Sequence, residues 1–195
     1  MNLRYLRSLF LSFTLVFSSV SLASAAENVC MGDIHGLALM TLKSKHVKLE
    51  LEQAIQMTDD SANFVGLDDF GGEVYQMVFA PKSMSLVSGS GGFSSKKSKA
   101  LKKITSLPLS QQDFLQILRA QMPDRFDLVS ENDGKVIWHD IKNKKLNIVT
   151  EGSIQYKVKR QTCQLPGRID ITFKKNTFSL KWISVKAVDS RPKSL

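Results

Sequence analysis

Apolar and polar residues alternate with a period of two along much of this chain. In VKLELE, residues 47–52, every second residue is apolar and the residues between them are charged. The same alternation recurs at 154–159, 169–174 and 178–182. Because a strand presents successive side chains to opposite faces, this pattern predicts antiparallel strands with one buried and one hydrated face.

Shorter apolar runs extend the pattern, and Asp, Gly, Asn and Pro separate them. The segment ENDGK, residues 131–135, contains the Asp-Gly pair of a tight hairpin, and KKNT, residues 174–177, is expected to join the last two strands. We therefore expect about ten strands, with SGSGGFSS, residues 88–95, as a local loop. The shorter runs are 62–67, 74–80, 84–88, 126–130, 135–139 and 145–150.

One segment has helical periodicity instead. Ser110 is the expected N-cap, Asp113 stands at the third helical position, and an apolar stripe that includes Phe114 follows at helical spacing. These signals predict a helix over Ser110–Gln121. A short basic helix is expected just before it, within 94–104.

Together these elements predict the fold class, which is mainly β (α+β). A sheet with one apolar face and too few helices to form a second layer tends to curl. The helices inserted near its middle would then cover the concave side. The expected architecture is a single curled antiparallel sheet forming an unclosed β-barrel with a helical lid, which encloses an apolar space.

The first 25 residues have the organisation of a secretory signal peptide. Arg4 and Arg7 precede the apolar run LFLSFTLVFSSVSLA, and small residues occupy the cleavage positions. The run is interrupted by serines and is shorter than the roughly 20 residues of a spanning helix. We expect cleavage after Ala25, with Ala26 as the alternative, which leaves residues 26–195 as one exported domain.

The charge balance adds a second indication about partners. The chain has 27 Lys and Arg residues against 18 Asp and Glu residues, a formal charge of +9 that loss of the signal peptide lowers by two. Such an excess either serves solubility or favours anionic surfaces such as lipid headgroups, with nucleic acid not expected as a partner. The basic run from Lys96 to Lys103 is open to the same two interpretations.

The two cysteines, Cys30 and Cys163, allow a single pairing. In an oxidising compartment an even count favours a disulfide, which would stabilise the fold by about 4 kcal/mol through loop closure. Metal binding is the alternative, although no His or Cys lies at ligand spacing to either. AENV before Cys30 is not the acylation box of a lipoprotein, so we expect an exported protein that is not lipidated there.

Residues suited to catalysis are sparse. His35, His46 and His139 are scattered, and no nucleophile elbow, paired-acid motif or metal-ligand spacing surrounds them. GSGGFSS lacks the Lys-Ser/Thr ending of a phosphate-binding loop. We therefore predict a binding protein rather than an enzyme, without a cofactor or metal, and keep a hydrolase of envelope lipids as the catalytic alternative.

The stretch NFVGLDDFGGEVYQMVF, residues 63–79, places a phenylalanine in a polar turn. Asp and Gly are ordinary turn residues, because Asp accepts hydrogen bonds from the nearby backbone and Gly adopts positive φ without strain. An aromatic ring there normally faces water, which forgoes about 2 kcal/mol of burial. Phe70 therefore either folds back onto the sheet edge or serves to contact an apolar surface.

Three stretches in this order resemble the LolA/LolB family of bacterial lipoprotein carriers, in particular LolB-like outer-membrane lipoproteins. VGLDDFGGEVYQMVF resembles the family's strand, turn and strand, and KALKKITSLPLSQQDFLQIL resembles its inserted helices. CQLPGRIDITFKKNTFSLKWISV resembles the closing strand pair, so that the likeness runs from about Val47 to Lys186. Two features depart from the family. The acylation box is missing, and GDIHGLALMTLKS, residues 32–44, replaces the N-terminal helix with an extra strand or loop.

The resemblance implies a hydrophobic cavity that receives acyl chains of lipids or lipoproteins. It also implies that Phe70 corresponds to a protruding residue that inserts into a membrane, with Leu67 adding apolar area if its strand ends early. We therefore expect a periplasmic monomer, peripheral at most to the outer membrane, that contacts a membrane surface transiently. The alternative is a non-catalytic structural or interaction protein of the envelope, in which the same side chains close into a dry core.

The expected cavity lining consists of alternate strand residues together with two residues of the helix. They are Leu49, Leu51, Val65, Met77, Phe79, Ile171, Leu180 and Trp182 from the strands, and Phe114 and Leu118 from the helix.

Overall fold

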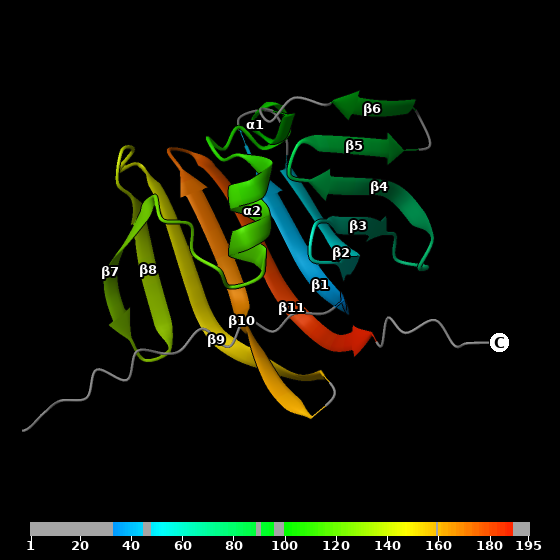
Figure 1. Ribbon diagram of the computed structural model, residues 1–195. Coiled ribbons are helices and arrows are strands. Elements are labelled where there is room, and N and C mark those ends of the chain that lie inside the picture. Colours follow the sequence, from blue (N-terminus) through cyan, green and yellow to red (C-terminus); the bar gives the residue numbers. More distant parts are fainter. Residues whose placement is uncertain (1–32, 45–47, 89–90, 96–99, 159, 189–195) are drawn as a thin grey trace, which may run out of the picture.

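The computed structural model describes residues 33–44, 48–88, 91–95, 100–158 and 160–188. Within them, eleven antiparallel strands form one sheet and two short helices lie over it (Figure 1). The elements are β1 (Asp33–Lys43), β2 (Lys48–Met57), β3 (Ala62–Leu67), β4 (Glu73–Ala80), β5 (Ser83–Ser88), β6 (Gly91–Ser95), α1 (Ala100–Thr105), α2 (Gln111–Leu118), β7 (Phe126–Asn132), β8 (Lys135–Asp140), β9 (Leu146–Val158), β10 (Gln161–Phe173) and β11 (Asn176–Val188).

The strand order explains why the helices cover the sheet. It runs β6-β5-β4-β3-β2-β1-β11-β10-β9-β8-β7, so the chain builds one meander outward from β1 and a second meander inward to β11. The two meanders join where β1 pairs with β11. The chain must cross from the edge strand β6 to the opposite edge strand β7, and α1 and α2 lie on that crossing (Figure 1). Because β6 and β7 do not pair with each other, the barrel is unclosed.

Contacts among three aromatic rings show that the sheet is curved. Phe79 on β4 and Phe178 on β11 lie four strand positions apart, a path of about 19 Å across a flat sheet. Nevertheless the ring of Phe114 on α2 has its centroid 5.1 Å from the centroid of each. The sheet therefore curls around α2, and the predicted fold class is confirmed.

The hydrophobic core lies between the concave face and the helices. Alternate residues of most strands enter it, as the period-two pattern predicted, and the lid adds Leu101, Leu107 and Leu109 along with the inner face of α2. Phe64 and Phe79 meet edge to face with centroids 5.4 Å apart, a favoured aromatic geometry. None of the helices in the described ranges is long and apolar enough to span a membrane.

Several local predictions are confirmed. Ser110 caps α2, with its hydroxyl accepting from the Asp113 N–H at 3.0 Å and the Asp113 carboxylate accepting from the Ser110 N–H. The helix ends at Leu118, three residues earlier than expected. Asp133 and Gly134 both have positive φ, as a tight turn between β7 and β8 requires. Of the strand or loop expected within residues 32–44, the structure has the strand, because Asp33–Lys43 forms β1 at the centre of the sheet.

Two expectations about loops are wrong. SGSGGFSS is not simply a loop, because Gly91–Ser95 forms the edge strand β6 and pairs with β5. Ladder formation uses only backbone groups, so a glycine-rich segment at an edge needs no apolar alternation to pair. The two strands expected around 145–150 and 154–159 are a single strand, β9, which runs from Leu146 to Val158 and continues through Gly152 at φ +63°. The count is therefore eleven strands in the described part of the chain.

Candidate functional site

The concave face collects most of the expected cavity lining. Leu49 packs partly buried against the core. The others that face the interior are at most 7% exposed, so their side chains fill the space between the sheet and α2. These residues are Met77, Phe79, Phe114, Leu118, Ile171, Leu180 and Trp182.

Two of the expected lining residues need correction. Val65 lies on the outer face, because inward positions of β3 are Ala62, Phe64 and Gly66. The hairpin register therefore puts the odd-numbered residues of this strand outside, which the sequence run alone did not reveal. Leu51 is only half-buried, and it borders a pocket at the β3–β4 turn.

The interior also contains a group of four methionines, of which only Met77 was predicted to line it. Met40, Met57, Met77 and Met84 come from four different strands, and each is at most 7% exposed. Methionine is unbranched and polarisable, so it fills irregular space and repacks readily around different partners. The signal in the sequence was their position in alternating strand runs. This lining is more adaptable than one of valine and isoleucine.

A row of polar groups crosses this apolar surface. Pairing across β4, β3, β2, β1 and β11 aligns Tyr75, Gly66, Gln53, Ala38 and Trp182. The Tyr75 hydroxyl, both polar atoms of the Gln53 amide and the Trp182 indole nitrogen are buried and make no hydrogen bond within the protein. Leaving such groups unsatisfied costs about 1–3 kcal/mol each. The period-two pattern missed this row, since Gln53 occupies an inward position where an apolar residue was expected.

Tyr75 and Gln53 approach each other because Gly66 lies between them. A Cβ on Gly66 would be 2.5 Å from Cε1 of Tyr75, which shows that the ring lies flat over the glycine. Burial raises the pKa of Tyr75 to about 12, and the Gln53 side chain partly opposes that rise. The two side chains are thus within electrostatic reach, although no donor and acceptor between them are aligned as a hydrogen bond.

Ion pairs connect both ends of the lid helix α2 to the sheet. Near its start, Asp113 Oδ2 lies 3.0 Å from Arg125 Nη1, and the same guanidinium pairs with the fully buried carboxylate of Asp140 at the end of β8. Near its end, Arg119 Nη1 lies 3.2 Å from Asp59 Oδ1 in the β2–β3 turn. The second pair is the weaker constraint, because the Asp59 side chain is largely solvated.

The β3–β4 turn holds Phe70 away from the protein. Asp68 Oδ1 accepts from the N–H groups of Phe70 at 2.9 Å and Gly72 at 2.7 Å, and Gly71 adopts φ +79°. Phe70 is 98% exposed. The interpretation in which its ring folds back onto the sheet edge is therefore wrong, and a rigid turn presents the ring to the surroundings.

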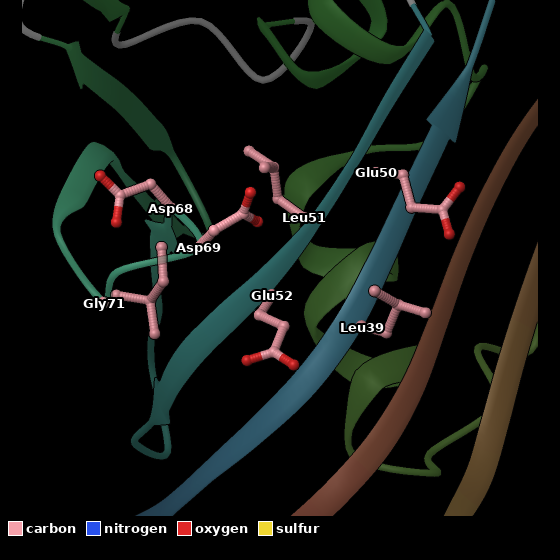
Figure 2. A pocket seen from close by; sticks show the side chains of 8 residues that line it. Leu39, Glu50, Leu51, Glu52, Asp68, Asp69 and Gly71 are labelled. Carbon is pink, nitrogen blue, oxygen red and sulfur yellow. The ribbon is translucent and has the colours of Figure 1, made fainter.

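Carboxylates surround the base of this turn (Figure 2). A pocket of about 390 Å³ is lined by Leu39, Glu50, Leu51, Glu52, Leu67, Asp68, Asp69 and Gly71. Leu67 is half-buried within β3 and borders this pocket, so it adds little apolar area beside Phe70. The helix α1 lies near the opposite end of β4 and β5 (Figure 1). Its exposed Lys102 is therefore badly placed to offset the acidic charge, and Lys96, Lys97 and Lys99 lie outside the described residues.

The remaining candidate residues do not form a site. His35 lies on β1 and His139 on β8, in different meanders of the sheet, and His46 is outside the described residues. In the described part of the chain, no three His, Cys, Asp or Glu side chains gather in a metal-binding arrangement. Cys163 is buried on β10, at 1% exposure, and Cys30 lies outside the described residues. Their pairing stays a prediction.

Comparisons with known proteins give a likeness of fold. No family model matches the chain, and no curated protein sequence matches it. A DUF1329 family protein from Desulfovibrio piger has a TM-score of 0.51 and 10% identity, covering 84% of this chain and 88% of that one. A LolA superfamily protein from Nitrosomonas europaea has a TM-score of 0.45 and 9% identity, covering 83% and 89%. At these identities the likeness concerns the fold alone, and the chain has the lid-covered, open half-barrel that the resemblance to the LolA/LolB family implied.

Proposed function

We propose that this chain is an exported, non-catalytic carrier or acceptor that holds acyl chains of lipids or lipoproteins between its curved sheet and α2. The observation that carries the proposal is the methionine-rich concave face beneath a lid of only eight helical residues. Ligand sites of this class are concave and mostly apolar. An adaptable lining admits chains of different length and unsaturation.

Entry of an acyl chain requires the lid to move, because the lining residues are packed together. The pair between Arg119 and Asp59 is the contact that yields most readily, since water already screens one partner. The ion pair between Arg125 and the buried Asp140 stays intact during this movement, so the start of α2 acts as the hinge. In this arrangement α2 swings away from the β2–β3 turn while its first turn stays attached.

Phe70 is the proposed point of contact with a membrane. One inserted ring contributes about 2 kcal/mol, so contact is brief, as cargo transfer requires. The acidic pocket beside it limits insertion into anionic lipid and favours zwitterionic surfaces. In this proposal residues 1–25 act as a cleaved signal peptide, and the domain of residues 26–195 operates in the periplasm.

The second candidate function is an envelope interaction protein with a dry core. The same close packing favours it, since Phe114, Ile117 and Leu118 on the lid are all at most 1% exposed. In that case the methionines are ordinary core residues and the lid never opens. Uptake of a lipid distinguishes the two functions.

The test is lipid extraction and mass spectrometry of protein purified from the periplasm, followed by uptake of a fluorescent acyl lipid. We expect co-purifying acyl lipid and saturable uptake. Asp59→Asn should speed uptake by loosening the lid, whereas Asp60→Asn, the matched change at the exposed neighbour, should not. Absence of both bound lipid and uptake would favour the dry-core function.

A further inference from the structure

We propose that the polar row of Tyr75, Gln53 and Trp182 binds carbonyl oxygens of neutral acyl esters or amides. This inference rests on the proposed acyl-chain function and specifies the polar part of the ligand. It assigns a role to three buried groups whose polar atoms make no aligned hydrogen bond within the protein.

The three residues lie on one inward-facing row although they come from separate parts of the chain. Gln53 is fully buried on β2, Trp182 is 5% exposed on β11, and Tyr75 packs against the core from β4. Small residues occupy the intervening positions, Gly66 on β3 and Ala38 on β1. The row therefore alternates large polar side chains with glycine and alanine, whose small size leaves space between the large side chains.

Glycines hold both aromatic rings in place. The Tyr75 ring lies over Gly66, and the Trp182 ring lies over Gly36, where a Cβ would be 2.8 Å from Cζ3. Each ring thus lies close to the sheet, which restricts the position of the Tyr75 hydroxyl and of the Trp182 indole nitrogen. Fixed donors of this kind bind an acceptor with little loss of side-chain freedom.

The chemistry of the row selects the ligand. The indole nitrogen is a donor only, whereas the Tyr75 hydroxyl and the Gln53 amide can each donate as well. Each of these donors suits a carbonyl oxygen, which accepts hydrogen bonds through two lone pairs. The row contains no cationic side chain, so a fatty carboxylate would lose its hydration without gaining a counter-charge. Neutral esters and amides are therefore preferred to free fatty acids.

Apolar rows flank the polar row on either side. Leu51, Met40 and Leu180 are aligned on one side, and Met77, Phe64 and Ile55 on the other. An acyl chain that lies along these strands would cross the polar row. The ester then docks at the row while the hydrocarbon occupies the apolar surface next to it.

The test compares three probes on the purified exported chain. Methyl laurate, laurate and an alkane of equal length each compete with an environment-sensitive fluorophore for the interior. We expect methyl laurate to bind most tightly. Tyr75→Phe and Gln53→Met, which keep side-chain volume, should each weaken methyl laurate binding by roughly fivefold, the equivalent of one net hydrogen bond. Alkane binding should not change.

Tyr156→Phe is the matched control, because it removes the same hydroxyl from a buried tyrosine on β9, outside the row. It should leave the ratio of ester to alkane affinity unchanged. In the absence of ligand, Tyr75→Phe and Gln53→Met should raise the Tm, since each removes a buried group without a partner.

The outcomes separate the site from the function it rests on. Binding of none of the three probes overturns the proposed function and the site together. Equal affinity for ester and alkane, unaffected by the two substitutions, overturns the site and leaves the carrier function standing. A lower Tm in both variants with ester binding intact also overturns it, because the row would then be satisfied by structural water alone.

Discussion

Phe114 on the lid helix and Phe178 on β11 meet edge to face, with ring centroids 5.1 Å apart and planes at 77°. This contact fastens α2 to the strand beside β1, at the centre of the sheet. Phe114 is 1% exposed, so Phe114→Ala leaves a large hole between lid and sheet. We expect the free energy of unfolding to fall by about 3–5 kcal/mol, measured by urea denaturation.

Phe70→Ala is the control for this substitution. It removes the same ring from a position that is 98% exposed, and should change stability by no more than about 0.5 kcal/mol. A comparable loss in both variants would contradict the assignment of Phe114 to the lid contact and Phe70 to the surface.

The contact made by Phe70 is tested by Phe70→Glu. We expect folding and ligand uptake to remain nearly unchanged while cosedimentation with liposomes is abolished. Val129→Glu places the same charge on another exposed apolar position, in β7, and should retain binding. Asp69→Asn, which neutralises one carboxylate at the pocket, should strengthen binding to anionic vesicles. Retained liposome binding by Phe70→Glu would exclude the membrane contact.

Gly66→Ala tests the close approach between β3 and β4. The new methyl would overlap the Tyr75 ring, whose nearest atom is 2.5 Å from the Cβ position. Because a rigid ring must shift, we expect a loss of about 1–3 kcal/mol in unfolding free energy. Gly167→Ala is the matched control, since its nearest contact is an ordinary 3.4 Å. If the two substitutions are equally harmless, Tyr75 does not lie over Gly66.

Tyr75 predicts a specific pH dependence of stability. Its pKa is raised from 10.0 to about 12 in the folded protein, so folding favours the neutral phenol. This contribution is fully present below pH 10.0 and is lost as the pH rises towards about 12, because only the unfolded chain releases the proton readily. The unfolding free energy of the wild type should therefore fall more steeply over that range than that of Tyr75→Phe. Parallel profiles would mean that the phenol is solvated.

The predicted pairing of Cys30 with Cys163 has a direct chemical test. Protein purified from the periplasm and denatured without reductant should contain no titratable thiol. Reduction should lower stability by roughly 4 kcal/mol if loop closure dominates. Two free thiols per molecule would refute the disulfide.

The sequence by itself determined most of the elements and most of their inward faces. Alternation marked Phe178, Leu180 and Trp182 as buried, and Ser110 with Asp113 marked the start of the lid helix. These predictions succeed because side-chain direction in a strand and capping at a helix end are local properties of the chain. The position of Phe70 in a polar turn was equally visible in the sequence.

The tertiary structure decided everything that depends on pairing between distant segments. Val65 faces outward because the register of β3 against β2 and β4 turns Phe64 inward. Gly91–Ser95 became a strand because the edge of β5 offered backbone partners. The row of Tyr75, Gln53 and Trp182 exists only where β4, β2 and β11 lie in one sheet. Its members are far apart in the sequence. A local pattern therefore cannot predict that folding places these three polar groups in one row of the concave face.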